Sequence, residues 1–445
     1  MKTEITRRDA LVLGVSAAAL VATGASAQDA SKVKAADAAA PSLPIEKDAS
    51  LRMLRPVRFV QADEDVFRAN AKKFTDKTGV EIKVDFVGWE DINQQTAVTS
   101  NSGAGPDIII GFGDAPHIYV DKLVELTDVA DYLGKRYGGW LTLAQKYGMR
   151  AKSKSWIGLP FGASGGPLVY RKSLVKAAGF DRVPDDHAGF LELCKKLKAA
   201  GKPAGFALGN AVGDGNGFAS WLLWSHKAAL LDEEGNIVIN SKETVAALKY
   251  LKELYPTFIA GTPSWNDVSN NRAYSAQDIG LTANGVSLYF SLKNDPATKA
   301  IADDTEHQFL PKGLASTYPM SGLTLNAMVF KHSKYPNAAK AFLQFMLEHE
   351  QYEAWLNANS GYWSQPLAAY ADAAVWSGDP KVAIFKDTMK TPYYNGYNGP
   401  ISTATGAVTA DYVLVQMCAS VATDAATPEA AAAEAERRAK RYFRR

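Results

Sequence analysis

Aromatic side chains beside amide, hydroxyl and carboxylate groups form the pattern in this chain with the clearest chemical meaning. They gather in three turn-rich segments, residues 89–91, 361–366 and 393–400. A flat ring offers a large contact area at low entropic cost, and tyrosine adds a polar group. A sugar needs both, because its C–H faces stack on rings while its hydroxyls form hydrogen bonds. The aromatic ligand contacts that this pattern predicts are Trp89, Trp363, Tyr394 and Tyr397.

Packing in a hydrophobic core is the competing interpretation of these rings. For Trp89 and Trp363 the two interpretations are equally good. Glycines and asparagines surround Tyr394 and Tyr397, so a regular core strand describes that segment less well. Trp355 stands inside a helical pattern, and we assign it to the core.

The residues that could catalyse a reaction are scattered. None of the six histidines forms the H-E-x-x-H pattern of a metalloprotease, and no phosphate-binding loop of the G-x-x-x-x-G-K-S/T type occurs. The glycine-rich segment 213–217 lacks the dinucleotide fingerprint, and we interpret it as a loop. We therefore expect no catalytic residue, no metal site and no cofactor. Two carboxylates that meet in space could still form a glycan hydrolase, which stays as a rival hypothesis.

Charge and cysteine content narrow the class of protein further. The formal net charge is +2, so we expect no nucleic-acid partner, and we interpret the basic C-terminal residues as a solvated helix end. Cys194 and Cys418 lie far apart in sequence without a C-x-x-C motif. Two buried free thiols are the default expectation, with a disulfide as the alternative.

The first 27 residues read as a secretory signal sequence. Two arginines at 7–8 precede an apolar run at 10–21, and small residues at 25–27 form a cleavage site. The arginine pair is typical of a twin-arginine export address, although the general secretory route stays open. We therefore expect a periplasmic protein. Residues 28–54 carry almost no large apolar side chains, and we expect a flexible leader there.

Strand and helix patterns alternate after this leader. Val57 and Phe59 indicate a short strand, and a helical pattern follows up to Gly79. Residues 80–86 alternate between apolar and charged side chains, and the continuous apolar run at 107–110 is typical of a strand buried on both faces. This order predicts an α/β fold with a mainly parallel sheet flanked by helices.

The length of the chain requires more than one core. A single core rarely grows beyond roughly 250–300 residues, so we expect two lobes. Residues 156–171 contain two extended segments separated by small residues, which suits a crossover between the lobes. Helical patterns resume beyond this crossover.

An ordered series of short motifs resembles the extracellular solute-binding proteins of ABC importers, in particular the maltose-binding-like group of sugar binders. Each motif is weak alone, and the order of the series carries the resemblance. The matching segments are residues 105–114, 122–127, 158–161, 170–174, 284–286, 337–342, 361–362 and 428–430.

The resemblance implies a two-lobe periplasmic binding protein fold of type II, the Venus-flytrap arrangement, with several hinge crossovers. Each lobe would be a mainly parallel sheet flanked by helices. Lobe one would hold residues 55–162 and 312–360. Lobe two would hold residues 163–311 and 361–445.

The resemblance also implies ligand-binding residues at matching positions. Asp63, Glu64 and Asp65 match the loop after the first strand, which often contacts the ligand. Asp114 matches a position that is often acidic in sugar binders and bonds sugar hydroxyls.

The chain departs from the maltose-type pattern at three positions. Ser164 stands where those proteins carry a hinge glutamate, while Gly111 and Ser287 stand where they carry tryptophans. These departures argue against maltose itself. Tyr289 and Trp89 would supply stacking instead, and we keep Ser164 and Ser287 as expected ligand contacts.

The function that follows is capture of a mono- or oligosaccharide in the cleft between two lobes, by hinge closure, and its delivery to an ABC permease in the inner membrane. The protein would act as a monomer and would not be an enzyme. A polyol or another organic solute on the same fold is the first alternative. An envelope enzyme that acts on glycans is the second.

Overall fold

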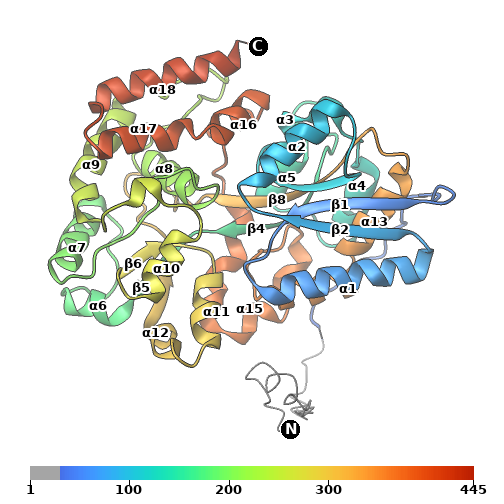
Figure 1. Ribbon diagram of the computed structural model, residues 1–445, viewed down its shortest axis with the longest axis horizontal. Coiled ribbons are helices and arrows are strands. Elements are labelled where there is room, and N and C mark those ends of the chain that lie inside the picture. Colours follow the sequence, from blue (N-terminus) through green and yellow to red (C-terminus); the bar gives the residue numbers. More distant parts are fainter. Residues whose placement is uncertain (1–30, 445) are drawn as a thin grey trace, which may run out of the picture. The chain divides into compact units, whose positions relative to one another are not determined.

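Two β-sheets organise the computed structural model, which describes residues 31–444 (Figure 1). A five-stranded sheet has the order β2-β1-β3-β8-β4, and a three-stranded sheet has the order β6-β5-β7. The expected signal sequence, residues 1–27, lies outside the described residues. The strands are β1 (Ser50–Pro56), β2 (Glu81–Val87), β3 (Ile108–Phe112), β4 (Leu159–Gly165), β5 (Leu168–Arg171), β6 (Leu281–Ala283), β7 (Thr305–Gln308) and β8 (Gly322–Val329).

Helices fill most of the segments between these strands. The helices before β6 are α1 (Gln61–Thr78), α2 (Asp91–Ser102), α3 (Ala115–Ile118), α4 (Thr127–Arg136), α5 (Thr142–Gly148), α6 (Lys172–Ala177), α7 (His187–Ala199), α8 (Asp214–Ser225), α9 (Lys242–Leu254) and α10 (Ser269–Ser275). The later ones are α11 (Ser287–Asn294), α12 (Lys299–Asp304), α13 (Pro336–Leu347), α14 (His349–Ala358), α15 (Val375–Gly378), the 3-10 helix η6 (Pro380–Lys390), α16 (Thr403–Ala410), α17 (Val413–Ala422) and α18 (Pro428–Phe443).

The first half of the five-stranded sheet follows the sequence pattern. Helix α1 buries Phe67 and Phe74, and it ends at Gly79, whose φ of 77° is the left-handed conformation that glycine adopts without strain. β1 pairs in parallel with β2 on one side and with β3 on the other. β3 is buried along its whole length, as a continuous apolar run predicts.

The expectation of mainly parallel sheets is wrong beyond β3. β8 lies antiparallel between β3 and β4, and all ladders of the three-stranded sheet are antiparallel. The direction of β8 depends on a distant part of the chain. β8 joins the five-stranded sheet only after the chain has passed through the three-stranded sheet, and the path of this return determines the direction in which β8 runs. A local strand–helix–strand unit would have made it parallel.

The expectation of a flexible leader over residues 28–54 is wrong for its described C-terminal part. β1 already begins at Ser50, and Leu51 and Met53 are buried. The carboxylate of Glu46 accepts the backbone N–H groups of Asn337 and Ala338 at 2.9 and 3.0 Å, at the start of α13. β1 is buried because it pairs with β2 on one edge and with β3 on the other, and residues 28–54 alone have too few apolar side chains to form a core. The strand ends at Pro56, so Val57 and Phe59 follow it.

The chain crosses between the two sheets more than once. β4 belongs to the five-stranded sheet and β5, two residues later, to the three-stranded one, which confirms the predicted crossover at 156–171. A return crossover joins β7 to β8 through residues 309–321. The backbones of Ala163 and Ser364 exchange hydrogen bonds at 3.1 and 2.8 Å.

Two hydrophobic clusters form the core. One surrounds the five-stranded sheet and includes Trp363, Tyr370 and Phe385, and the other includes helices α8, α9 and α16–α18, which lie together in Figure 1. Cys194 and Cys418 are buried free thiols in the second cluster. Shared side-chain contacts do not define rigid bodies, so the lobe boundaries stay a prediction.

A buried ion pair holds α1 against the sheet and α14. Arg55 Nη2 donates to Asp63 Oδ2 at 3.0 Å, and Trp355 Nε1 donates to Asp63 Oδ1 at 2.6 Å. The side chains of Arg55 and Asp63 are only 2% and 3% exposed. The guanidinium also lies 4.4 Å from the centre of the Phe67 ring. A pair this deep depends on both charges, because one charge alone would be buried without compensation.

We therefore expect Asp63→Ala to lower the free energy of unfolding by about 3–5 kcal/mol, the range for breaking a buried pair. The measurement is urea unfolding followed by circular dichroism. Asp76→Ala is the matched control, because Asp76 forms an exposed i,i+4 pair with Lys72 on the same helix. The control should change stability by about 0.5 kcal/mol or less. Equal losses in both variants would contradict the structural role of Asp63.

Candidate ligand-binding site

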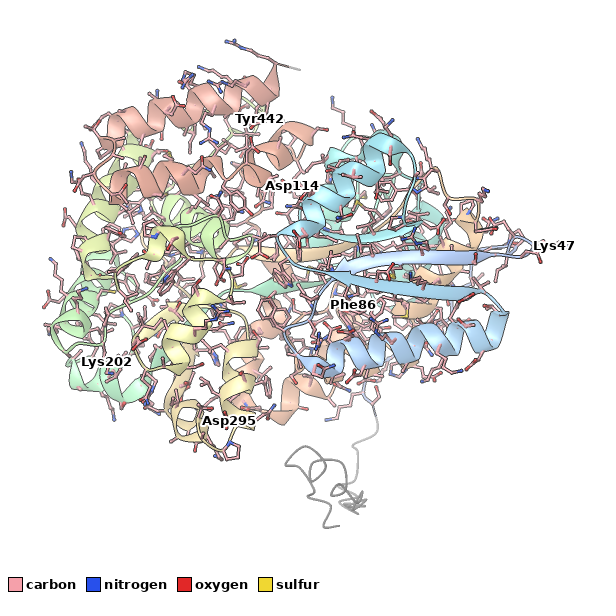
Figure 2. All side chains as sticks on the ribbon, in the orientation of Figure 1. Lys47, Phe86, Asp114, Lys202, Asp295 and Tyr442 are labelled. Atoms are coloured by element: carbon pink, nitrogen blue, oxygen red, sulfur yellow. The ribbon has the colours of Figure 1, made fainter. Side chains whose placement is uncertain are left out.

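Cavities lie at the carboxyl ends of the three parallel strands. Phe59 follows β1, Trp89 follows β2 and Asp114 follows β3, and all three line cavities. Asp114 lies where α3 and α16 come together (Figure 2). Ligands of open α/β sheets bind outside the carboxyl ends of the strands, so this edge is where a site is expected.

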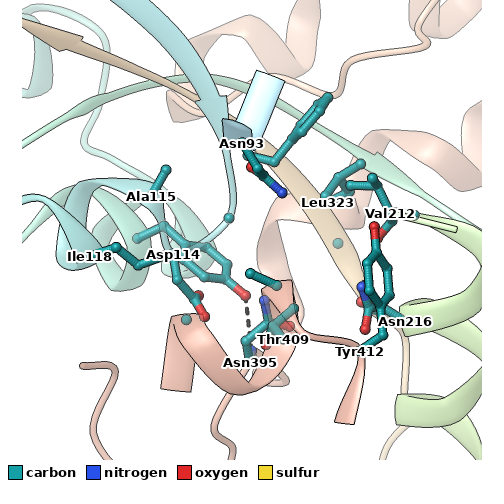
Figure 3. A pocket seen from close by; sticks show the side chains of 18 of the residues that line it. Asn93, Asp114, Ala115, Ile118, Val212, Asn216, Leu323, Asn395, Thr409 and Tyr412 are labelled. Atoms are coloured by element: carbon teal, nitrogen blue, oxygen red, sulfur yellow. Dashed lines mark hydrogen bonds between the residues drawn. The ribbon is translucent and has the colours of Figure 1, made fainter. Parts of the chain in front are cut away.

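The first cavity, which we call the Asp114 cavity, encloses about 730 Å³ free of protein atoms, including space that is open to solvent (Figure 3). Asp114 and Asn395 lie on one side of this space, and Asn216 and Tyr412 face them from the other. The lining side chains that can form hydrogen bonds are Asn93, Asp114, Tyr119, Tyr147, Asn216, Ser321, Asn395, Thr409 and Tyr412.

The carboxyl group of Asp114 is the least satisfied polar group of this cavity. Its residue is 4% exposed, and neither side-chain oxygen has a hydrogen-bond partner among the described residues. Burial raises the pKa of Asp114 to about 8, and the nearby Asn395 side chain offsets part of that rise. A buried polar group without a partner costs about 1–3 kcal/mol. Asp114 is therefore placed to receive hydrogen bonds from a bound molecule.

Tyr147 is hydrogen-bonded to the Asn395 segment in the wall of the Asp114 cavity. The Asn395 backbone N–H donates to the Tyr147 hydroxyl oxygen at 2.9 Å, the dashed contact in Figure 3. Burial and the nearby Asp114 raise the pKa of Tyr147 well above its usual value. The hydroxyl therefore keeps its proton and stays a hydrogen-bond donor.

A second cavity of about 690 Å³, the Asp214 cavity, adjoins the first. The two share Gly213, Ser321 and Leu323 as a common wall. The lining of the Asp214 cavity is Phe59, Trp89, Ser164–Gly166, Gly213, Asp214, Gly217, Phe218, Trp221, Asp267, Ala283–Gly285, Leu310, Ser321, Leu323 and Tyr362. The two cavities together form one compound site.

One wall of the Asp214 cavity is aromatic. The Trp89 ring lies 4.8 Å from Phe59 and 6.4 Å from Tyr362, centre to centre. Trp363 stacks on Trp89 at 6.0 Å, with 17° between the ring planes. The indole N–H of Trp89 donates to the Val57 carbonyl at 2.8 Å, which fixes the ring. This wall can stack against the apolar face of a ring-shaped or extended polyhydroxylated ligand.

Two carboxyl groups also line this cavity: Asp214 is the first residue of α8, and Asp267 lies in the loop before α10. The Asp267 carboxylate accepts the backbone N–H groups of Val212, Gly213 and Asp214 at 2.7, 2.9 and 2.8 Å. Burial and the charge of Asp267 raise the pKa of Asp214 well above its usual value, against a lowering contact with Asn270. Oδ2 of Asp214 has no hydrogen-bond partner among the described residues.

Ser164 lies in the sequence G-A-S-G-G at 162–166, which has the letters of a serine-hydrolase nucleophile turn. The segment is part of strand β4, whereas a nucleophile stands on a sharp turn between a strand and a helix. The Ser164 hydroxyl bonds the Tyr362 hydroxyl, and the lining contains no histidine. The geometry therefore gives Ser164 a polar contact role.

Three of the predicted ligand contacts line the two cavities. Asp114 lines one cavity, and Trp89 and Ser164 line the other. Trp363 is buried behind Trp89, with an indole N–H that has no partner among the described residues. Tyr397 lines a separate surface depression with Trp224 and Tyr393.

Other predicted contacts lie outside both cavities. Asp63 is in the buried ion pair, Glu64 pairs with Arg58 and Arg68, and Asp65 is exposed on α1. The cause is a register difference. The loop after β1 ends at Val60, so the three acids fall inside α1.

Three further predicted ligand contacts also lie outside both cavities. The Tyr289 hydroxyl donates to Asp379 at 2.7 Å, and the Tyr394 hydroxyl donates to the Gly399 carbonyl at 2.8 Å. Ser287 is buried at the start of α11. None of the three lines the Asp114 cavity or the Asp214 cavity.

The sequence analysis missed Asp214, Asp267 and Asn395. The interpretation of 213–217 as a loop is wrong, because α8 begins at Asp214. The signal that could have revealed this start is an acidic residue before an apolar helical run, which suits the positive end of a helix. Asp267 and Asn395 have no local signal, since only the fold brings them to the site.

None of the helices described between residues 31 and 444 combines the length and apolar character needed to cross a bilayer.

Comparisons with known proteins agree on one class. The Escherichia coli K12 protein YcjN, assigned as an ABC transporter periplasmic-binding protein, is 23% identical over 311 residues, which is 67% of this chain and 68% of YcjN. A sugar transporter from Arthrobacter chlorophenolicus A6 with bound laminaribiose has a TM-score of 0.75 at 18% identity and covers 88% of this chain and 99% of its own.

A solute-binding protein of an ABC transporter from Agrobacterium radiobacter K84, in complex with ribitol, has a TM-score of 0.72 at 18% identity, with 88% and 98% of the two chains covered. These likenesses show the two-lobe fold of periplasmic solute-binding proteins. Residues 69–384 match the family model described as bacterial extracellular solute-binding protein. The chain belongs to this family of bacterial extracellular solute-binding proteins.

Proposed function

We propose that this protein captures a carbohydrate in the compound site and delivers it to an ABC permease. The observation that carries the proposal is the pairing of an aromatic wall with buried, unpartnered polar groups in two adjoining cavities. Trp89 and Tyr362 offer ring faces, while Asp114 and Asp214 offer hydrogen-bonding oxygens. A polyhydroxylated molecule supplies both the apolar face and the hydroxyl donors that these groups lack.

The relatives support the same class of ligand. One solved structure holds laminaribiose and another holds ribitol, and both molecules carry many hydroxyl groups. The buried polar groups also make such a site selective, because a hydroxyl with the wrong orientation leaves a buried partner unsatisfied at a cost of about 1–3 kcal/mol.

Binding would proceed by closure of two lobes about the crossovers between β4 and β5 and between β7 and β8. The lobe boundaries that we propose are 55–162 with 312–360 and 163–311 with 361–445. A ligand that contacts both lobes binds the closed state better and so raises its population. The protein would bind without turnover, as a monomer.

The proposed place of action is the periplasm, after export directed by residues 1–27. The adjacent arginines at 7–8 favour the twin-arginine route. The partner would be the permease of an ABC importer in the inner membrane, as the family membership supports.

A thermal-shift panel tests the proposed ligand class. Mono- and disaccharides and polyols are compared with amino acids and polyamines. At 100 times its Kd, a ligand stabilises the folded state by about 2.7 kcal/mol, which raises Tm. We expect at least one saccharide or polyol to raise Tm without being consumed. If only amino acids or polyamines raise Tm, the proposal fails, and release of reducing ends from a glycan would favour the enzyme.

Acidic sugars should bind poorly. Asp114, Asp214 and Asp267 line the compound site, and its lining contains no lysine, arginine or histidine. A carboxylate or phosphate on the ligand would be buried beside these groups without a counter-charge. We expect glucuronate and glucose 6-phosphate to bind at least about 10-fold more weakly than glucose, since a 1.4 kcal/mol penalty suffices. Isothermal calorimetry measures this, and tighter binding of the anions would contradict the electrostatics.

Asp114→Asn should stabilise the ligand-free protein while it weakens ligand binding. Burial raises the pKa of Asp114 from 3.8 to about 8, so between these values the native state holds a proton that the unfolded state has released. The native state therefore loses stability as the pH rises from about 4 to about 8. Asparagine does not titrate, so the variant should gain about 1–3 kcal/mol at pH 8 and little at pH 4.

Urea unfolding of both proteins at several pH values measures this difference. Asp76→Asn is the control, because its carboxylate is exposed on α1, and its stability difference from the parent should stay small at every pH. A variant that is destabilised at pH 8, or one that binds the saccharide as tightly as the parent does, would contradict the role of Asp114.

A further inference from the structure

Three carboxyl groups with no basic neighbour distinguish the compound site from an ordinary polar cleft. Asp114 and Asp267 are 4% and 7% exposed, and Asp214 is half-buried with its Oδ2 atom shielded from solvent. Among the described residues, neither cavity is lined by a lysine, an arginine or a histidine. Buried carboxylates in folded proteins are normally paired or coordinate a metal. A buried carboxyl group without such a partner keeps its proton more readily, and it becomes a carboxylate where backbone N–H groups or a cationic ligand compensate the charge.

The backbone supplies this compensation for Asp267. Three consecutive N–H groups, from Val212 to Asp214, donate to its carboxylate at 2.7–2.9 Å. These groups lie at the start of α8, where the helix dipole favours a negative charge. Asp267 thus occupies the one place of this cavity where an anionic ligand could have bound. It also remains charged more readily than its burial alone would allow.

Asp214 accepts none of these three N–H groups, although its place as the first residue of α8 also favours a negative charge. It lies next to Asp267, the charge of Asp267 adds to the effect of burial, and its Oδ2 has no partner in the described chain. Asn270 is the polar group that partly offsets this. Glu90, at the start of α2, adds to the negative field on Asp267. Two carboxyl groups that share one site disfavour each other's ionised form, and a cation beside them would restore it.

A metal ion is the less suitable cation here. No set of three His, Cys, Asp or Glu side chains within residues 31–444 is arranged to hold one. The rings of Phe59, Trp89 and Tyr362 line the same cavity. An aromatic face attracts an organic ammonium group by its electrostatic field. Carboxyl groups and aromatic rings in one cavity suit an amine attached to a carbon skeleton.

We propose that the Asp214 cavity binds a protonated amino group of the ligand, with Asp214 as its direct partner and Asp267 behind it. The ligand class is thus an amino sugar or an aminopolyol, whose hydroxyl groups extend into the Asp114 cavity. This inference rests on the proposed carbohydrate function and narrows it. Asp214 is the residue that sets the preference for the amine, and Asp114 binds hydroxyl groups that neutral sugars also carry.

Matched ligand pairs test the preference by isothermal calorimetry. D-Glucosamine is compared with D-glucose and N-acetylglucosamine, D-galactosamine with D-galactose, and 1-amino-1-deoxysorbitol with sorbitol. At about pH 6 the amino groups are protonated, because aliphatic amines beside electron-withdrawing groups titrate near 7.7–8.0. In at least one pair we expect the amine to bind 10-fold or more tightly than its neutral partner.

Two variants separate the two carboxyl groups. Asp214→Asn should abolish the preference, so that the amine and the neutral partner bind alike. Asp114→Asn should weaken both members of the pair by a similar factor and leave their ratio unchanged. Asp76→Asn, on the exposed side of α1, is the matched control and should leave every affinity unchanged.

Proton release gives a readout that needs no variant. Burial and the charge of Asp267 raise the pKa of Asp214 well above its usual value in the empty site. An ammonium partner favours its carboxylate, so amine binding at about pH 6 should release up to one proton. Titrations in two buffers of different ionisation enthalpy measure this release, and a neutral partner should release less.

Each result decides between the two proposals. Neutral sugars that bind as tightly as their amino counterparts, or amine binding without proton release, would overturn the amine preference and leave the carbohydrate function standing. Binding of neutral saccharides alone, with no amine bound, would do the same. If no saccharide or polyol of either kind binds, the proposed function itself fails.

Discussion

The insertion of β8 between β3 and β4 is the constraint on which the site depends. Its register pairs Phe112 with Leu325 at one edge and Gly165 with Gly322 at the other. The residues at its start, Ser321 and Leu323, form the wall shared by the two cavities. An antiparallel strand is positioned residue by residue by its hydrogen bonds. The same ladder therefore sets the spacing between Asp114, which follows β3, and the crossover that follows β4.

Carboxyl oxygens without hydrogen-bond partners make the empty site less stable. Both oxygens of the buried Asp114 and the Oδ2 atom of the half-buried Asp214 lack a partner among the described residues, while the buried Asp63 is paired with Arg55 and Trp355. A paired carboxylate contributes to the fold, whereas an unpaired one raises the free energy of the empty protein. A ligand that supplies the missing partners lowers that free energy, so the cost of the empty site becomes part of the driving force for binding.

The aromatic and acidic components come from different parts of the fold. The rings of Phe59 and Trp89 follow strands of the five-stranded sheet, and Tyr362 follows α14. Asp214 is the first residue of α8, and Asp267 precedes α10. A ligand in this cavity would therefore contact segments that lie far apart in the sequence.

The sequence by itself determined the local elements and the class of protein. Local patterns predicted helix α1, the buried strand β3 and the crossover between β4 and β5. The ordered series of motifs indicated the family. It also identified Trp89, Ser164 and Asp114 as residues that line the site.

Only the tertiary structure decided which acidic side chains line the two cavities. Asp63 and Asp214 look alike in sequence, each at the start of a helix, yet one is paired in the core and the other faces open space. The direction of β8 and the approach of Asp267 to α8 were likewise undetermined. The physical reason is that strand pairing and the solvation of a carboxyl group depend on residues tens to hundreds of positions away, whereas helix and strand periodicity depend on near neighbours.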